Sequence, residues 1–141
     1  MIKWGKLGKG FTLIELLLVL FIIGVLSAIA IPYMRGRSDD AKWSEGKAIA
    51  GNIKTAAQAY RGEKSAGFDF SATTLEDLGF TVNPGGDLDG KFFTAKCFSI
   101  EFSANGDYLI TVDAAKSIRP DPPSSPRQVT LDNAGIFNEI P

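Results

Sequence analysis

The chain has 141 residues, enough for one modest domain with an added segment. It carries 15 basic and 16 acidic residues, one cysteine and no histidine. Without histidine the commonest general base and most zinc-site designs are excluded, and a single cysteine excludes a disulfide within the chain. Because no broad basic surplus exists, we expect no nucleic-acid partner. Composition therefore favours a protein that is not an enzyme and has no cofactor.

The first part of the chain divides into a basic segment and an apolar run. Residues 1–10 contain Lys3, Lys6 and Lys9 and no acid, whereas residues 11–31 are apolar with one charge, Glu15. As a helix rising ~1.5 Å per residue, the run spans about 31 Å, close to the thickness of a bilayer's hydrocarbon core. The three lysines before the run predict that the N-terminal end of the helix lies in the cytoplasm.

Three interpretations of the run remain open from its residues. The first is a plain transmembrane anchor. The second is a secretory signal peptide with a cleavage site at Ala28-Ile29-Ala30. The third gives Glu15 a purpose, because an isolated carboxylate in lipid costs on the order of a few kcal/mol and usually has a partner. A cut between Gly10 and Phe11 would create an α-amino group that pairs with Glu15 of a neighbouring copy.

The residues Gly10-Phe11-Thr12-Leu13-Ile14-Glu15 resemble the prepilin processing and N-methylation motif of type IV pilins and type II secretion pseudopilins. The resemblance covers about residues 8–60. It implies that a membrane peptidase cuts after Gly10 and methylates Phe11, and that Glu15 guides subunit assembly. The ten-residue leader is typical of the type IVa and pseudopilin groups.

Pro32 falls where the family has a helix-weakening proline. It lacks an N–H and its ring clashes with the carbonyl of Ala28, so we predict a kink or a loosened turn there. Two interpretations stay open: a break at the membrane exit, or a segment that melts when the subunit leaves the bilayer for a filament.

Beyond Pro32 the sequence predicts an amphipathic continuation, giving one helix over about residues 12–61. One apolar set, expected to pack on a C-terminal sheet, comprises Ile49, Ile53, Ala56 and Tyr60. A second set of small residues, expected to allow close helix contacts in a filament core, comprises Gly46, Ala48, Ala50 and Gly51.

The remainder, residues 63–141, predicts a small antiparallel sheet of about four strands. Residues 97–102 and 108–113 alternate about the tight-turn pair Asn105-Gly106, with Cys97 expected on the face opposite Phe98. A second hairpin is expected about residues 133–135, after a proline-rich surface loop at 119–127. Thr73-Thr74-Leu75-Glu76 predicts a capped helix or turn over 74–78. The fold class is therefore α+β and pilin-like.

Asp87 and Asp89 are the residues that we consider for metal binding. They lack the spacing of an EF-hand. The resemblance also implies a C-terminal calcium loop like that of major pseudopilins, but the residues of that loop cannot be mapped onto this sequence. We therefore interpret them as an acidic turn and assign no metal ligands and no catalytic residues.

The sequence thus predicts four segments: a cleaved leader at 1–10, a membrane-spanning and filament-core helix at 11–31, an amphipathic helix at 32–62 and a globular domain at 63–141. The expected function is that of a structural subunit of a type IV pilus-like filament. The alternatives are a pseudopilin of a type II secretion system and a non-polymerising anchored or secreted binding domain. Expected partners are other pilins or pseudopilins, the prepilin peptidase, the assembly machinery and the bacterial inner membrane.

Overall fold

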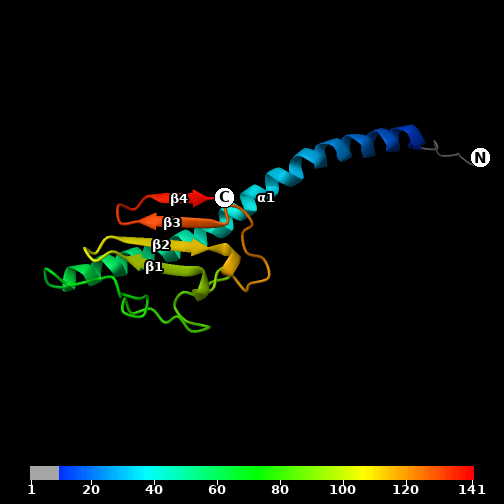
Figure 1. Cartoon of the computed structure of the whole chain (residues 1–141). Coiled ribbons are helices and arrows are strands. Elements are labelled where there is room, and N and C mark those ends of the chain that lie inside the picture. The colour runs from blue at the N-terminus through cyan, green and yellow to red at the C-terminus, as the bar shows by residue number, and fades with distance from the viewer. Residues whose placement is uncertain (1–9) are drawn as a thin grey trace, which may run out of the picture. The chain divides into compact units, whose positions relative to one another are not determined.

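The computed structural model describes residues 10–141, so the predicted leader lies outside the described residues except for Gly10. It contains one long helix followed by a four-stranded sheet, which confirms the α+β prediction (Figure 1). The elements are α1 (Leu13–Glu63), the short 3-10 helix η1 (Ala95–Cys97), β1 (Phe98–Phe102), β2 (Tyr108–Asp113), the 3-10 helix η2 (Ala114–Lys116), β3 (Gln128–Asp132) and β4 (Phe137–Ile140).

The chain divides into two compact units that meet between Arg35 and Gly36, inside α1. Pro32 belongs to the first unit and lies within the helix, which is continuous from Leu13 to Glu63. The predicted loosening at Pro32 stays a prediction. This helix is long and apolar enough near its start to cross a membrane, and none of its most apolar 18 residues is buried.

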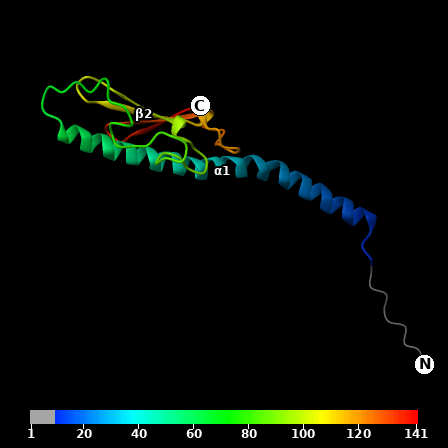
Figure 2. The same ribbon diagram turned by 90° about the horizontal axis from the view of Figure 1, so that it is seen from below.

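In the second unit, the sheet is an antiparallel meander in the order β1-β2-β3-β4. Ile110 of β2 lies opposite Ile100 of β1 and Leu131 of β3, so one apolar row crosses the sheet. Both predicted hairpins are present. Their turns contain Gly106 and Gly135, whose φ angles of 85° and 91° suit glycine. The sheet lies alongside the C-terminal part of α1 as a second layer (Figure 2).

The face of α1 that packs on the sheet overlaps the predicted one, which comprised Ile49, Ile53, Ala56 and Tyr60, but is centred on neighbouring residues. The apolar and small residues buried on the helix are Trp43, Gly46, Ala50, Ile53 and Ala57. Ile53 was predicted correctly, and Ile49 and Tyr60 pack at the edge of this core.

The assignment of Gly46 and Ala50 to helix contacts between subunits was wrong, because both lie inside the monomer. Gly46 makes room for Phe93, whose ring atoms Cζ and Cε2 would lie 2.9 and 3.0 Å from an added Cβ. Phe93 in turn packs on Trp43, with ring centroids 5.1 Å apart. The absence of a side chain at Gly46 therefore lets a core aromatic reach the helix.

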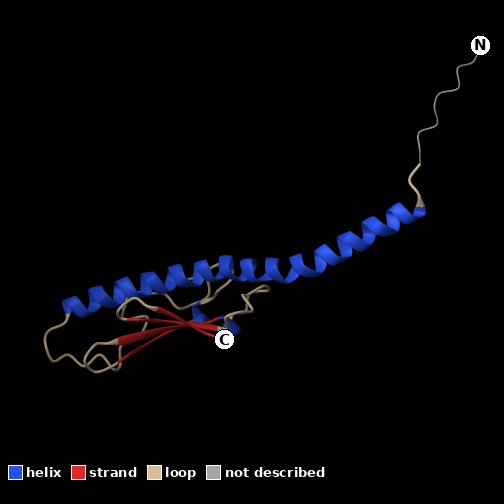
Figure 3. Ribbon diagram, turned by 90° about the horizontal axis from the view of Figure 1, so that it is seen from above, coloured by secondary structure: helices blue, strands red, loops and turns tan. Residues whose placement is uncertain are grey.

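The segment between α1 and β1 is mostly irregular (Figure 3). Its expected capped turn is present, but the reciprocal pair is one residue later: Asp77 accepts from the backbone N–H and hydroxyl of Thr74 at 2.8 and 2.9 Å. The predicted position of Cys97 on a strand was wrong, whereas burial of a lone cysteine is the ordinary case. Cys97 ends η1 rather than lying on the outer face of a strand, and its side chain is buried.

Candidate functional site at the start of the helix

The first turn of α1 is closed by a reciprocal pair between Thr12 and Glu15. The Glu15 backbone N–H donates to Thr12 Oγ1 at 3.2 Å. In return, Glu15 Oε2 accepts from the Thr12 backbone N–H at 3.1 Å and from its hydroxyl at 2.9 Å. This is a capping box, which satisfies donors that a helix start leaves unpaired. The carboxylate also lies at the positive end of the helix dipole.

Within a single chain, the structure therefore pairs Glu15 with Thr12. The sequence reasoning overlooked this partner, although the spacing Thr-x-x-Glu before an apolar run is the usual signal for it. Gly10 and Phe11 are exposed and precede the helix, which begins at Leu13. The three predicted residues Gly10, Phe11 and Glu15 thus lie within one short, accessible stretch.

The helix that follows has an apolar surface that no part of the described chain covers. Its large apolar side chains are all exposed, and they are Leu13, Ile14, Leu16, Leu17, Leu18, Val19, Leu20, Phe21, Ile22, Ile23, Val25, Leu26, Ile29 and Ile31. They occupy every side of the helix, unlike the one-sided pattern of a helix on a globular domain. A contiguous apolar surface of this size requires a membrane or other protein chains around it.

Gly24 and Gly36 flank Pro32 in this part of the helix. Nothing lies within 4 Å of a Cβ built on either glycine. Neither glycine is therefore required by packing within one chain. Pro32, which lies between them, lacks an N–H and so removes one hydrogen bond of the helix.

Within the second unit, polar contacts join the first residues of that unit, which belong to α1, to the proline-rich loop. Asp39 Oδ2 accepts from Ser124 N at 3.0 Å, from Ser124 Oγ at 2.6 Å and from Ser125 N at 3.1 Å. Lys42 Nζ donates to Asp121 Oδ1 at 2.7 Å and lies 3.6 Å from Asp39 Oδ1. We call these five residues the Asp39 clamp.

The Asp39 clamp fixes the proline-rich loop, which the sequence predicted only as a surface feature. Burial acts to raise the pKa of Asp39, but the hydrogen bonds from Ser124 and Ser125 and the charge of Lys42 together lower it. The hydrogen bond to Asp121 raises the pKa of Lys42. Trp43 adds a further contact, because its Nε1 donates to the carbonyl of Pro126 at 3.0 Å.

Asp87 and Asp89 organise their own loop. Asp87 accepts from Thr81 N at 2.9 Å, and Asp89 accepts from Gly85 N and Ala95 N, both at 2.8 Å. These backbone hydrogen bonds lower the pKa of both carboxyl groups. Over residues 10–141, no three side chains of histidine, cysteine, aspartate or glutamate are grouped to hold a metal ion.

The comparisons with known proteins agree with this architecture. The family model described as the prokaryotic N-terminal methylation motif matches residues 6–31. The chain is 39% identical over 83 residues to the type IV major pilin protein PilA of Myxococcus xanthus, covering 59% of this chain and 36% of that protein. It is 36% identical over 88 residues to a fimbrial protein of Pseudomonas aeruginosa, covering 61% and 57%. The chain thus spans about a third to just over half of these two relatives.

A longer match extends through the sheet. The chain is 30% identical over 135 residues to the fimbrial protein EcpB of Eikenella corrodens, covering 90% of this chain and 81% of that protein. No solved structure matches. A methylation motif on a long helix, followed by a small antiparallel sheet, defines the class of pilin-like proteins. Within that class, the chain belongs to the type IV pilin family, whose members are structural proteins rather than enzymes.

Proposed function

We propose that this protein is a structural subunit of a type IV pilus-like filament. The observation that carries the proposal is the helix surface at Leu13–Ile31, apolar on all sides, uncovered in the single chain and interrupted by the carboxylate of Glu15. Such a surface suits lipid first and the packed helices of a filament afterwards. Family membership supports the same function.

Processing would cut the chain between Gly10 and Phe11, followed by methylation of the new α-amino group of Phe11. The exposure of both residues and the start of the helix at Leu13 support this step, because a peptidase needs an accessible, non-helical backbone. In this proposal the leader stays in the cytoplasm, the apolar helix spans the inner membrane and the globular unit lies outside it.

Assembly would then exchange one partner of Glu15 for another. In the single chain, the Glu15 carboxylate accepts from Thr12, which makes the subunit tolerable in the bilayer before it polymerises. In the filament, the same carboxylate would pair with the Phe11 ammonium of a neighbouring copy. A charged pair in an apolar surrounding fixes register, because a shifted helix leaves both charges unpaired.

Pro32 would serve as the helix break in this assembly. The open surroundings of Gly24 and Gly36 support a segment that loosens at small cost when the subunit leaves the membrane. The four segments at 1–10, 11–31, 32–62 and 63–141 would then act as leader, filament core, amphipathic connection and outer domain.

The pseudopilin of a type II secretion system remains the alternative with the same N-terminal chemistry. The relatives that match are named as pilins and fimbrial proteins, and this favours the pilus. The first partners would be further copies of this chain and the prepilin peptidase with its assembly machinery.

The roles of Glu15 can be separated by two variants. We expect Glu15→Ala to be processed and inserted normally but to yield few sheared filaments, because the Phe11 ammonium loses its partner. Thr12→Val removes the capping hydroxyl and keeps the carboxylate, so it should assemble. Glu63→Ala, at the other end of α1, is the control. Unchanged filament yield in Glu15→Ala would refute the pairing.

The intact mass of the protein from cell envelopes tests the processing site. A chain beginning at Phe11 with one added methyl group is expected. A chain beginning at Ile31 would instead identify a signal peptide, and a full-length chain in cells with active peptidase would identify an uncleaved anchor. Gly10→Ala should slow or block the cut.

A further inference from the structure

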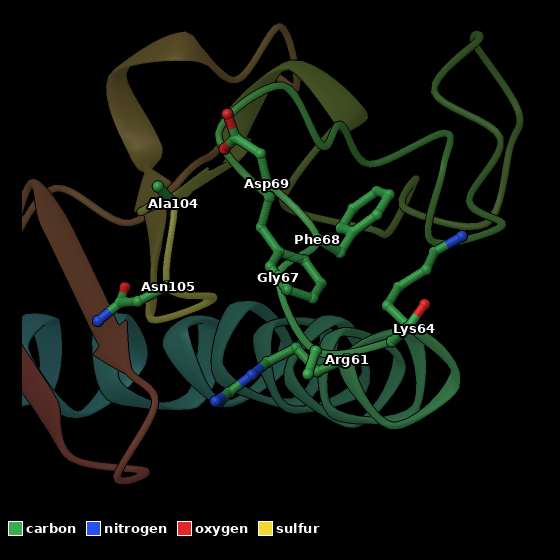
Figure 4. A pocket seen from close by; sticks show the side chains of 10 residues that line it. Arg61, Lys64, Gly67, Phe68, Asp69, Ala104 and Asn105 are labelled. Atoms are coloured by element: carbon green, nitrogen blue, oxygen red, sulfur yellow. The ribbon is translucent and has the colours of Figure 1, made fainter.

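The open pocket at the end of α1 does not gather its polar groups around one point. Its volume is about 460 Å³, and its walls come from the helix end, the loop that follows and the turn between β1 and β2. Figure 4 shows that the Arg61 guanidinium, the Phe68 ring and the Asp69 carboxylate point to different sides. At the edge of the sheet formed by β1, by contrast, the directions of the polar groups follow from the strand register.

The backbone of β1 presents unpaired groups along one edge of the sheet. β1 and β4 are the two edge strands (Figure 1). Ser103 N–H donates to the Asp107 carbonyl at 2.7 Å, and in an antiparallel pair such bonded positions alternate with unbonded ones. Ser99 and Glu101 therefore bond to β2, whereas the N–H and C=O of Ile100 point out of the sheet. No hydrogen bond from the described part of the chain reaches either group of Ile100.

The open section of this edge has a limit on each side. Toward the start of β1, Phe98 N–H donates to the Ala95 carbonyl. Toward its end, the Phe102 ring stacks on Phe70, with centroids 6.1 Å apart. Ile100 lies midway between these limits, so it is the residue with which an added strand would pair.

A pocket with apolar walls lies beside Ile100. It has a volume of about 380 Å³, and its walls include Leu75 and Val82 from the segment before β1. The side chain of Ile100 is on the inner face of the sheet, because it lies opposite Ile110, which is fully buried. Directly opposite side chains of an antiparallel pair share a face. A residue paired with Ile100 would therefore direct its side chain toward the pocket, and an aliphatic side chain suits these walls.

Glu101 supplies a charge next to the pocket, on the other face of the strand. It is exposed, and it forms no ion pair with another described residue. In an antiparallel strand added at this edge, the residue before the one opposite Ile100 lies opposite Glu101. Lysine or arginine at that position would pair with the carboxylate across the two strands.

The β4 edge is less open than the β1 edge. Asp132 N–H donates to the Ile136 carbonyl at 3.3 Å. By the same alternation, the outward-facing backbone groups of β4 belong to Phe137 and Glu139. The next outward position is Pro141, which has no N–H. β1 contains neither proline nor lysine, which commonly protect an edge, so β1 is the edge suited to an added strand.

We propose that the β1 edge binds an extended segment of another protein as an additional antiparallel strand. The segment carries lysine or arginine followed directly by isoleucine, leucine or valine. Its aliphatic residue exchanges both backbone hydrogen bonds with Ile100 and places its side chain between Leu75 and Val82, while its cation pairs with Glu101. Within residues 10–141, no lysine or arginine is followed directly by isoleucine, leucine or valine, so the partner is not a second copy of this chain.

Hydrogen exchange at the Ile100 amide tests the proposal. The isotope-labelled full-length protein in detergent micelles is measured by NMR with and without a capped peptide of sequence Thr-Lys-Ile-Ser-Val. The amide of Glu101, which bonds to β2, is the internal control. We expect the Ile100 amide to exchange at least about tenfold faster than that of Glu101 in the free protein, and to slow by at least about tenfold when the peptide binds.

Two results of this measurement would overturn the proposal. Protection of the Ile100 amide without peptide would show that the chain itself covers the edge or, where protection rises with protein concentration, that a second copy does. Unchanged exchange in an excess of peptide would show that no strand is added.

Two altered peptides separate the backbone contact from the charge. Methylation of the peptide's isoleucine nitrogen removes the donor to the Ile100 carbonyl and should weaken binding by about tenfold. Glutamate in place of the peptide's lysine should weaken binding by about two- to fivefold, as expected for an exposed ion pair. Equal binding of the methylated peptide would contradict strand addition.

Three protein variants assign the site. Glu101→Lys should reverse the preference, so that the glutamate peptide binds more tightly than the lysine peptide, whereas Glu63→Lys makes the same charge change at the end of α1 and should keep the wild-type preference. Val82→Trp should fill the pocket and weaken binding by at least about tenfold. Unaltered binding in Val82→Trp, with wild-type thermal unfolding showing that the variant is folded, would overturn the site. Filament yield does not enter these tests, so their outcome is independent of the pilus proposal.

Discussion

The two ends of α1 have the same secondary structure and opposite surroundings. From Leu13 to Ile31 the apolar side chains are exposed on all sides, whereas from Asp39 to Ala57 one face is buried and the others are polar or open. The first part has too much apolar surface for its own chain to cover. The second part has only as much apolar surface as the sheet and its loops cover. The difference shows that the helix is built for two environments, one supplied by the fold and one by other molecules.

In the second part of α1, contacts with the loops of the globular unit begin at Asp39. Through the Asp39 clamp, the helix binds the loop at residues 119–127. About two turns later, the Glu45 carboxylate accepts from the backbone N–H groups of residues 91–93 at 2.9 to 3.2 Å. Two carboxylates on the helix thus attach two loops that are far away in sequence. These polar contacts fix the position along the helix at which the loops attach, and the apolar core fixes which face of the helix the sheet covers.

The largest expected difference between the two parts is in the cost of removing an aromatic ring. Trp43→Ala should destabilise the globular unit by about 3–5 kcal/mol, because it empties a buried site and leaves the Pro126 carbonyl without its donor. Phe21→Ala, whose ring is 69% exposed, should leave thermal unfolding of the globular unit unchanged. Equal effects in the two variants, measured by circular dichroism of the full chain in micelles, would contradict the comparison.

A smaller and pH-dependent loss is expected at the Asp39 clamp. Asp39→Asn should cost about 2 kcal/mol at neutral pH, because it removes charge-assisted hydrogen bonds to the loop. The pKa of Asp39 is lower in the folded than in the unfolded chain. The stabilisation is therefore complete above about pH 4 and is lost as the pH falls through the folded-state pKa. The stability gap between wild type and variant should narrow on acidification. A gap that stays constant from neutral pH to pH 3 would show that the charge is not responsible.

The smallest effect is expected at two glycines of α1. Gly46→Ala should destabilise by about 1 kcal/mol, because overpacking against Phe93 outweighs the gain in helix propensity. Gly51→Ala is the matched control, since nothing lies within 4 Å of its added Cβ, and it should stabilise the helix slightly. Chemical denaturation of both variants measures the difference, and a stabilised Gly46→Ala would show that Phe93 moves aside freely.

Much of this fold could be predicted because its signals are local. The turn pairs at Asn105-Gly106 and at residues 133–135, flanked by alternating apolar residues, predicted both hairpins correctly. The helix was predicted at 12–61 and found at Leu13–Glu63. Its buried face was predicted only in part, because choosing among several rows of small and apolar residues requires knowing where Phe93 arrives.

At the start of the helix, the motif selects the candidate residues, but not the contacts that they make. The roles of Gly10, Phe11 and Glu15 were inferred from the motif and stay a prediction, and the pairing of Glu15 with Thr12 was overlooked despite its local spacing. The Asp39 clamp could not be predicted, since its partners lie 79 to 86 residues away in the sequence and no periodicity connects them.

The sequence by itself determined the apolar run, the position of its single carboxylate and the order of helix and strands, because these depend on neighbouring residues and on the period of the backbone. Only the tertiary structure decided that Gly46 and Ala50 lie inside the monomer, that Cys97 is fully buried, and that Arg61 and Asn105 line one pocket. Each of these facts depends on segments distant along the chain meeting in space, which local propensity does not encode.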